Sequence, residues 1–220
     1  MIKCCIFDLD GTILDTITTI TYYVNVILEK HGIEPVTVDE CKYFAGNGAY
    51  KLIERSLNSK GIYEEERIRA LLAEYVPAYD EAPLYLTEVF DGISEMLSDL
   101  KAKGMKLAVL SNKPDTSVKS IVEHFFPGIF DEAAGGIDGV PLKPDPTAAI
   151  GILERLGISE SETAWVGDTS TDIETGKNLK AAISIGVLWG FRKREELVAA
   201  GADLIVDHPS EIVRGVEAIA

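Results

Sequence analysis

The sequence predicts an α/β fold: a parallel β-sheet covered by helices, with a small helical domain inserted after the first strand. Three features of the chain lead to this prediction. Short apolar runs end in polar residues, segments with helical periodicity lie between these runs, and a long helical interval follows the first run. Short apolar runs that alternate with helices are typical of parallel sheets covered on both faces.

The predicted strands are short and continuously apolar, the pattern of strands that are buried on both faces. The first strand, 4–7, ends at Asp8. Further strands are predicted at 107–110, 164–166, 183–189 and 204–206. Between them, apolar residues recur at helical spacing in 93–100 and 149–156, and a glycine follows each of these segments.

One interval is too long for an ordinary connection between parallel strands. After Asp8 the next clear strand begins near Lys106, whereas a strand–helix–strand unit needs only about 30 residues. The excess, residues 15–86, has helical periodicity. We therefore expect a helical domain of residues 15–86 and a core domain made of residues 1–14 and 87–220.

Composition and charge exclude several classes of protein. The chain has 220 residues, 46% hydrophobic and 26% charged, which is typical of globular proteins and excludes disordered or collagen-like chains. It carries 36 Asp and Glu against 21 Lys and Arg, a net charge of −15, and has no basic run. We therefore expect neither nucleic acid nor an anionic membrane as a partner. No stretch reaches the roughly 18 apolar residues of a membrane span.

The cysteines and the N-terminus indicate a reducing environment. Cys4, Cys5 and Cys41 form no disulfide framework, and the first residues do not follow the pattern of a signal peptide. We therefore expect a cytoplasmic protein. The sequence leaves the oligomeric state open between a monomer and a homodimer.

Carboxylates and other polar residues stand where the predicted strands end. They are Asp8, Asp10, Ser111, Asn112, Asp168 and, in a loop before a helix, Lys143. Ligands of open α/β sheets bind outside the carboxyl ends of the strands, so these residues are expected to converge. Carboxylates roughly 5 Å apart repel by about 3 kcal/mol per pair, and they must take up protons or hold a cation. Oxygen ligands favour a hard ion, and we predict Mg²⁺. Each Asp taken singly is equally well explained as a cap.

Other catalytic and binding motifs are missing from the sequence. The segment from Asp8 to Gly11 lacks the closing Glu of a calcium-binding EF-hand loop. There is no GxxxxGK[ST] phosphate loop, and no G-x-S-x-G turn that would support a Ser–His–Asp triad. These absences leave the carboxylates at the strand ends as the main chemical signal.

The spacing of these residues resembles the motifs of the haloacid dehalogenase superfamily. Residues 8–12 (Asp-Leu-Asp-Gly-Thr) resemble its first motif, 111–113 (Ser-Asn-Lys) its second, 143–144 (Lys-Pro) its third and 167–172 (Gly-Asp-Thr-Ser-Thr-Asp) its fourth. The motifs occur in order, and the insertion lies where this superfamily has a helical cap. The resemblance implies a doubly wound parallel sheet, a Rossmann-like core, with a small α-helical cap domain.

The resemblance implies a mechanism of phosphoryl transfer. Asp8 would attack a phosphate ester to form an aspartyl-phosphate, and Asp10 would act as general acid and base. Mg²⁺ would be held by Asp8, the backbone carbonyl of Asp10 and Asp168. Lys143 would hold the phosphate and neutralise Asp8. An acid at position 10 favours phosphoryl transfer over carbon–halogen cleavage, because true haloacid dehalogenases lack it.

The resemblance also implies contacts to the phosphate and a supporting carboxylate. The phosphate-binding residues would be Gly11, Thr12, Ser111, Asn112 (through nearby backbone groups) and Lys143. Asp172 lies four residues after Asp168 and would orient Lys143 or a metal-bound water. An acid stabilised by the dipole at a helix N-terminus explains Asp172 almost equally well.

The choice of substrate rests on a glycine-rich turn in the insertion. Gly46, Asn47 and Gly48 resemble the cap loop of phosphoglycolate phosphatases, although an ordinary turn between helices explains them equally well. Residues 186–191 carry a second such resemblance. Phosphoglycolate has a carboxylate, so a cation in the cap is expected, and the candidates are Lys42, Lys51 and Arg55. A solvated surface charge is the simpler explanation of each.

We therefore predict a Mg²⁺-dependent phosphatase that acts on a small phosphorylated metabolite, with 2-phosphoglycolate as the preferred substrate. Other phosphatases remain open as alternatives: a pyrophosphatase, a sugar phosphatase or a nucleotidase. A phosphomutase similar to β-phosphoglucomutase also remains open, because an aspartyl-phosphate can return its phosphate to a sugar. The alternative outside enzymes is a sensor that binds a phosphorylated ligand on the same fold.

Overall fold

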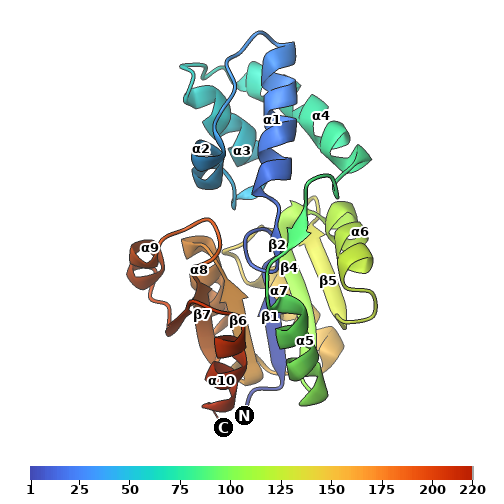
Figure 1. Ribbon diagram of the computed structural model, residues 1–220, viewed down its shortest axis with the longest axis vertical. Coiled ribbons are helices and arrows are strands. Elements are labelled where there is room, and N and C mark those ends of the chain that lie inside the picture. Colours follow the sequence, from blue (N-terminus) through green and yellow to red (C-terminus); the bar gives the residue numbers. More distant parts are fainter. Residues whose placement is uncertain (220) are drawn as a thin grey trace. The chain divides into compact units, whose positions relative to one another are not determined.

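The computed structural model describes residues 1–219 and contains a six-stranded sheet with the order β5-β4-β1-β6-β7-β8 (Figure 1). The strands are β5 (Glu132–Gly136), β4 (Lys106–Pro114), β1 (Cys4–Phe7), β6 (Thr163–Gly167), β7 (Ile183–Val187) and β8 (Leu204–Val206). Each neighbouring pair runs parallel. The chain winds outward from β1 in one direction and then in the other, so the predicted doubly wound α/β fold is confirmed.

The chain divides into two compact units, one of Met1–Asp15 with Val89–Ala220 and the other of Thr16–Glu88. The first unit contains the sheet and its helices. The second is helical and consists of α1 (Ile17–Lys30), α2 (Val38–Phe44), α3 (Gly48–Asn58) and α4 (Glu65–Glu81). Two short strands, β2 (Leu14–Asp15) and β3 (Glu88–Val89), pair where the chain passes between the units.

β1 is a central strand, and each of its side chains is buried. Cys4 and Ile6 pack against Ile152 of α7 (Thr147–Leu156) on one face of the sheet. Successive side chains of a strand point to opposite faces, so Cys5 and Phe7 face the other side. Burial on both faces is the reason why this strand is continuously apolar in the sequence.

Helices connect the strands and cover the sheet. Besides α7 they are α5 (Ile93–Ala102), α6 (Asp115–Phe125), α8 (Ser170–Leu179), α9 (Arg194–Ala199) and α10 (Ser210–Glu217). In Figure 1, α5 and α10 lie in front of the sheet, and the two helices contact each other. Among the described residues, no helix is long and apolar enough to cross a membrane.

The structure differs from the sequence prediction at two strands that border the site. β4 does not end at residue 110 but continues to Pro114, with an irregular register after Leu110. β5 was not predicted at all, because its sequence, Glu-Ala-Ala-Gly-Gly, is poor in the residues that favour strands. Gly135 is required there, since a Cβ atom would lie 2.5 Å from the Lys113 carbonyl oxygen. Small residues therefore allow β5 to approach the irregular end of β4.

Candidate active site

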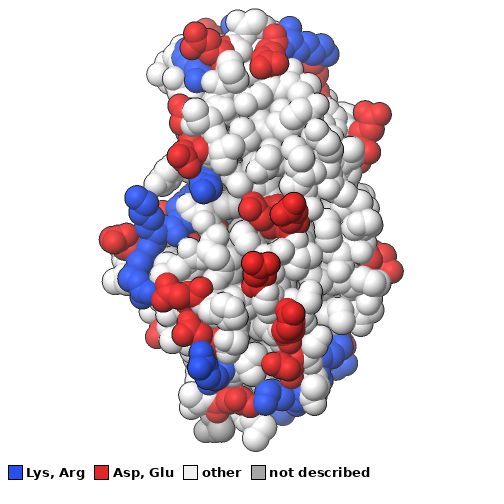
Figure 2. All heavy atoms as spheres, viewed as in Figure 1, with Lys and Arg blue, Asp and Glu red and all other residues white. Residues whose placement is uncertain are grey.

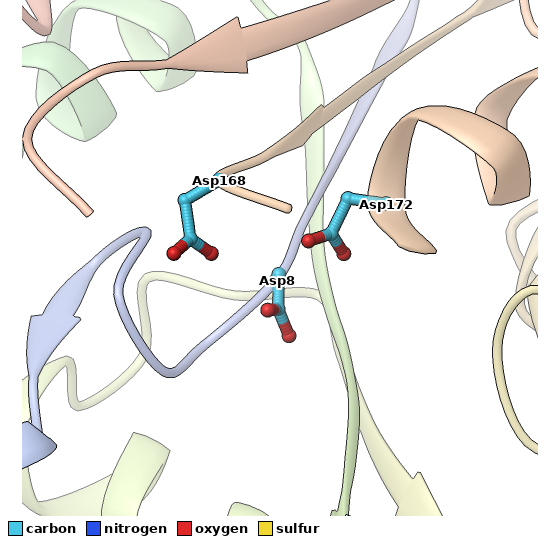
Figure 3. Close-up of side chains that lie close together, drawn as sticks. All are labelled: Asp8, Asp168 and Asp172. Carbon is cyan, nitrogen blue, oxygen red and sulfur yellow. The ribbon is translucent and has the colours of Figure 1, made fainter. Parts of the chain in front are cut away.

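Three buried carboxylates meet at the carboxyl edge of the sheet. Asp8 directly follows β1, Asp168 directly follows β6, and Asp172 lies in the first turn of α8. One carboxylate oxygen from each lies within 4.8 Å of the others, and the three side chains lie close together (Figure 3). The acidic side chains visible in Figure 2 are interspersed with lysines and arginines on the surface. Asp8, Asp168 and Asp172 differ from these because they are 6%, 0% and 1% exposed.

A buried lysine joins two of these carboxylates. Lys143 Nζ lies 2.7 Å from Asp8 Oδ1 and 2.8 Å from Asp172 Oδ1. Burial lowers the pKa of Lys143, but the charges of Asp172 and Asp8 outweigh burial and raise this pKa above its ordinary value. The ammonium is therefore charged at neutral pH, and it neutralises part of the charge of the cluster.

The backbone of Lys143 is fixed by the side chain of Asn112. The Asn112 amide nitrogen donates to the Lys143 carbonyl oxygen at 3.1 Å, and the Asn112 amide oxygen accepts from the Lys143 backbone N–H at 2.8 Å. The sequence predicted that backbone groups near Asn112, and not its side chain, bind the phosphate. The Asn112 side chain thus has a separate structural task, which is to place Lys143 beside the carboxylates.

Asp168 is held by contacts to both of its oxygens. Thr12 Oγ1 donates to Asp168 Oδ1 at 3.1 Å, and the Phe191 backbone N–H donates to Asp168 Oδ2 at 2.7 Å. Gly11 allows the loop after β1 to pass close by. Its φ is +84°, and a Cβ atom there would lie 2.4 Å from Asp168 Oδ2. The predicted phosphate-binding residues Gly11 and Thr12 are therefore packed directly against Asp168.

Asp172 makes contacts that fit both explanations that the sequence left open. Its Oδ2 accepts hydrogen bonds from the backbone N–H of Thr169 at 3.1 Å and from Thr169 Oγ1 at 2.7 Å, forming a capping box at the start of α8. Its Oδ1 accepts from Lys143 Nζ. One carboxylate thus caps the helix and orients the buried lysine.

Crowding and burial make the cluster electrostatically unfavourable without a cation. Burial and the charge of Asp172 raise the pKa of Asp8 to about 7, although Lys143 acts in the opposite direction. Burial, together with the charges of Asp172 and Asp8, holds the pKa of Asp168 well above its ordinary value. A divalent cation bound by carboxylate oxygens would offset this repulsion, so the residues present fit a metal site.

A second lysine contacts the second Asp of the first motif. Lys113 Nζ lies 3.1 Å from Asp10 Oδ1, and the two side chains are 8% and 16% exposed. Ser111 is also buried at this edge, and its hydroxyl accepts from the Lys113 backbone N–H at 3.2 Å. We did not predict Lys113 as a site residue. Its place as the third residue of the Ser-Asn-Lys motif was the available signal.

The glycine-rich turn lies in the helical unit and is fixed by Arg55. Arg55 donates from Nη1 to the Phe44 carbonyl oxygen at 2.9 Å and from Nη2 to Asn47 Oδ1 at 2.8 Å. Gly46 and Gly48, with φ of +106° and +83°, have the left-handed backbone that glycine favours. Arg55, proposed from the sequence as a substrate-binding cation, therefore has a structural partner in this turn.

The other candidate cations of the helical unit have acidic neighbours. Lys51 Nζ lies 2.6 Å from Glu54 Oε2, and Lys42 Nζ lies 3.9 Å from Asp39 Oδ1. Pairs at this spacing on a helix surface are ordinary solvated contacts that stabilise a helix by less than about 1 kcal/mol.

The sequence and fold match known proteins over nearly the whole chain. Residues 5–185 match the model of the haloacid dehalogenase-like hydrolases. The chain belongs to this family. It is 33% identical over 210 residues to a phosphoglycolate phosphatase of Aquifex aeolicus, covering 95% of this chain and 94% of the relative. A solved structure from Lactobacillus delbrueckii subsp. bulgaricus shares 32% identity and a TM-score of 0.93, over 97% of this chain and 98% of that one.

A further relative supports the same assignment. Phosphoglycolate phosphatase 1 of Pseudomonas aeruginosa is 30% identical over 213 residues, covering 94% of this chain and 77% of the relative. The predicted superfamily and the predicted enzyme class, a phosphatase, are thus confirmed. Phosphatases of this family generally use a divalent metal, and the buried carboxylate cluster is compatible with one.

Proposed function

We propose that this haloacid dehalogenase-like phosphatase uses Mg²⁺ to hydrolyse a small phosphate monoester through an aspartyl-phosphate, and that its substrate is 2-phosphoglycolate. The proposal is carried by the position of Asp8, which is buried beside Lys143 and Asp168 at the end of the central strand. The phosphoglycolate phosphatases among its relatives support the choice of substrate.

The first step is assigned to Asp8 and Asp10. A carboxylate oxygen of Asp8 forms a bond to the phosphorus atom while the ester P–O bond breaks, and Asp10 gives its proton to the leaving alkoxide. In the second step Asp10 takes a proton from water, the water oxygen attacks the phosphorus atom, and the carboxylate of Asp8 is released with inorganic phosphate. Asp8 and Asp10 both return to their starting states.

The remaining residues bind and orient the phosphate. The Lys143 ammonium lies beside Asp8 and reduces repulsion between this carboxylate and the incoming phosphate. Ser111 and the backbone near Asn112 are proposed to donate to the phosphate oxygens. The N–H groups of Gly11 and Thr12 donate to the Leu14 and Leu9 carbonyl oxygens, and Thr12 Oγ1 donates to Asp168, so this loop is proposed to shape the phosphate site. These roles follow the sequence motifs, and the clustering of the residues at one sheet edge supports them.

The proposed metal ligands are Asp8, Asp168 and the backbone carbonyl of Asp10. Bound Mg²⁺ would supply positive charge beside the reacting phosphate. Asp172 also belongs to the carboxylate cluster, but its oxygens contact Lys143 and Thr169, which favours a positioning role. Ligands made only of oxygen atoms favour Mg²⁺ over softer ions. The free, buried thiols of Cys4, Cys5 and Cys41 support a reducing, cytoplasmic environment.

A panel of phosphate esters tests the proposal. The panel contains 2-phosphoglycolate, pyrophosphate, hexose phosphates and nucleotides, each assayed with Mg²⁺ and with a chelator. The matched variants are Asp8→Asn and Asp99→Asn, an exposed aspartate on α5. We expect Mg²⁺-dependent phosphate release, the highest kcat/KM for 2-phosphoglycolate, and loss of activity in Asp8→Asn alone. A higher kcat/KM for another ester would replace the substrate, and binding without turnover of any ester would favour a sensor.

A further inference from the structure

Lys113 is a second buried ammonium at this edge of the sheet, and the proposed mechanism gives it no task. Its side chain is 8% exposed, and its Nζ lies 3.1 Å from Asp10 Oδ1. Burying a lysine is costly unless the charge is compensated. In the free enzyme the carboxylate of Asp10 compensates the charge of the Lys113 ammonium. Asp10 is also the residue that must approach the leaving oxygen of the substrate, so the ammonium lies next to the leaving group.

The position of Lys113 differs from that of Lys143 in a way that separates their tasks. Lys143 contacts Asp8 and Asp172, which places it at the attacking carboxylate. Lys113 contacts Asp10, the proposed acid–base residue. A lysine at Asp8 serves the transferred phosphate, whereas a lysine at Asp10 faces the alcohol that leaves.

We propose that Lys113 binds a carboxylate on the leaving alcohol and so selects phosphate esters of 2-hydroxy acids. This inference rests on the proposed function, because it uses Asp10 as the acid that contacts the leaving oxygen. In such an ester the carboxylate oxygens lie roughly 3 Å from the ester oxygen, about the length of one hydrogen bond. An ammonium 3.1 Å from Asp10 can therefore reach this carboxylate while it contacts Asp10.

Lys143 shows that a lysine at this site can contact two carboxylates at once. Its Nζ lies within 2.8 Å of oxygens from both Asp8 and Asp172. A lysine has three N–H donors, so the same arrangement is chemically available to Lys113 with Asp10 and the substrate. The site then recognises the carboxylate from the core unit, not from the cations of the helical unit that the sequence suggested.

The test compares two substrates that differ in one charge. They are 2-phosphoglycolate and its neutral amide, 2-phosphoglycolamide, and the quantity measured is the ratio of their kcat/KM values. We expect wild type to prefer the charged ester, and we expect Lys113→Gln to reduce this preference about 30-fold, as for loss of one charge-assisted hydrogen bond. Lys113→Arg keeps the charge and should retain most of the preference. The control is Lys103→Gln, an exposed lysine that pairs with Glu217.

Use of a ratio separates substrate selection from a structural role. If Lys113 only positions Asp10, Lys113→Gln lowers kcat/KM for both esters equally and the ratio is unchanged, which overturns the proposal. A wild-type enzyme that does not distinguish the two esters also overturns it, without any variant. Circular dichroism shows whether each variant is folded, and Lys113→Arg decides the outcome if Lys113→Gln is not.

A binding experiment separates this proposal from the proposed function. Calorimetric titration of Asp8→Asn and of Asp8→Asn/Lys113→Gln with both esters measures affinity without turnover. If another ester is the better substrate in the panel, phosphoglycolate fails as the physiological substrate. The Lys113 proposal still stands if Asp8→Asn binds the charged ester more tightly than the amide and the double variant does not. Equal affinities in Asp8→Asn would contradict it.

Discussion

The side-chain amide of Asn112 makes two hydrogen bonds to the backbone of Lys143, donating to its carbonyl oxygen and accepting from its N–H. These residues are 31 positions apart in the chain and come from different motifs. Through this pair the end of β4 determines where the ammonium meets Asp8 and Asp172. The placement of the lysine therefore depends on a neutral residue.

The pair predicts a large effect of Asn112→Ala on activity. Both backbone groups of Lys143 would lose a buried partner, at a cost of about 1–3 kcal/mol in the free energy of unfolding. Displacement of the ammonium by about 1 Å should lower kcat/KM about 100-fold. Asn178→Ala is the control, since exposed Asn178 donates to the carbonyl oxygen of neighbouring Pro144. Equal losses of kcat/KM in the two variants would show that Asn112 has no special role.

Asp8→Asn should stabilise the metal-free protein at about pH 8. The pKa of Asp8 is raised from 3.8 to about 7, so the folded state prefers the neutral carboxyl group. This contribution is fully present below pH 3.8 and is lost as the pH rises through about 7. Asparagine mimics the neutral group, and we expect about 2–4 kcal/mol of added stability at this pH.

Thermal unfolding with a chelator present measures this effect. The melting temperature of Asp8→Asn should exceed that of wild type by roughly 5–10 °C at about pH 8, with a difference near zero at about pH 4. Asp99→Asn serves as the control at an exposed site. A lower melting temperature for Asp8→Asn at the higher pH would contradict the electrostatic repulsion argued for the carboxylate cluster.

Asp168 and Asp172 should respond differently to loss of charge. Asp168→Asn removes a proposed ligand and should weaken Mg²⁺ binding by more than about 100-fold, whereas Asp172→Asn should weaken it by about 10-fold. Both variants should lose activity, because Asp172 orients Lys143. Calorimetric titration of the metal-free variants with Mg²⁺ measures the affinities. Equal losses of affinity would make Asp172 a ligand.

Arg55→Ala should loosen the glycine-rich turn of the helical unit. It removes hydrogen bonds to the Phe44 carbonyl oxygen and to Asn47 Oδ1. We expect a loss of about 1–2 kcal/mol in unfolding free energy and faster proteolysis near this turn, with unchanged affinity for Mg²⁺. Lys51→Ala, which removes only a surface pair with Glu54, is the matched control. Unchanged proteolysis in Arg55→Ala would show that Arg55 does not fix the turn.

The fold class was readable from the sequence because buried parallel strands leave apolar runs. β1 and β6 appear in the sequence as such runs, and Asp8 and Asp168 follow them directly. β5 left no such signal, since its small residues are required by close contact with the end of β4. Strand patterns thus identify the scaffold and the residues at its edge.

The contacts among the site residues could not be predicted from the sequence. No local pattern shows that Asn112 holds Lys143 or that Lys113 meets Asp10, since these are tertiary contacts between distant parts of the chain. Arg55 illustrates the same limit in the helical unit: its sequence position suggests a free surface cation, but its partners are in the glycine-rich turn. Residue types at strand ends predict the chemistry, and only the folded chain shows how each group is held.

The most direct test of the central claim is to trap the phosphorylated enzyme. Wild type and Asp8→Asn are mixed with 2-phosphoglycolate and Mg²⁺, quenched in acid within one turnover, and digested for mass spectrometry. We predict one added phosphoryl group on the wild-type peptide that contains Asp8, and none on Asp8→Asn. Phosphate release by wild type with no phosphorylated Asp8 at any quench time, or a phosphoryl group on another residue, would contradict the account.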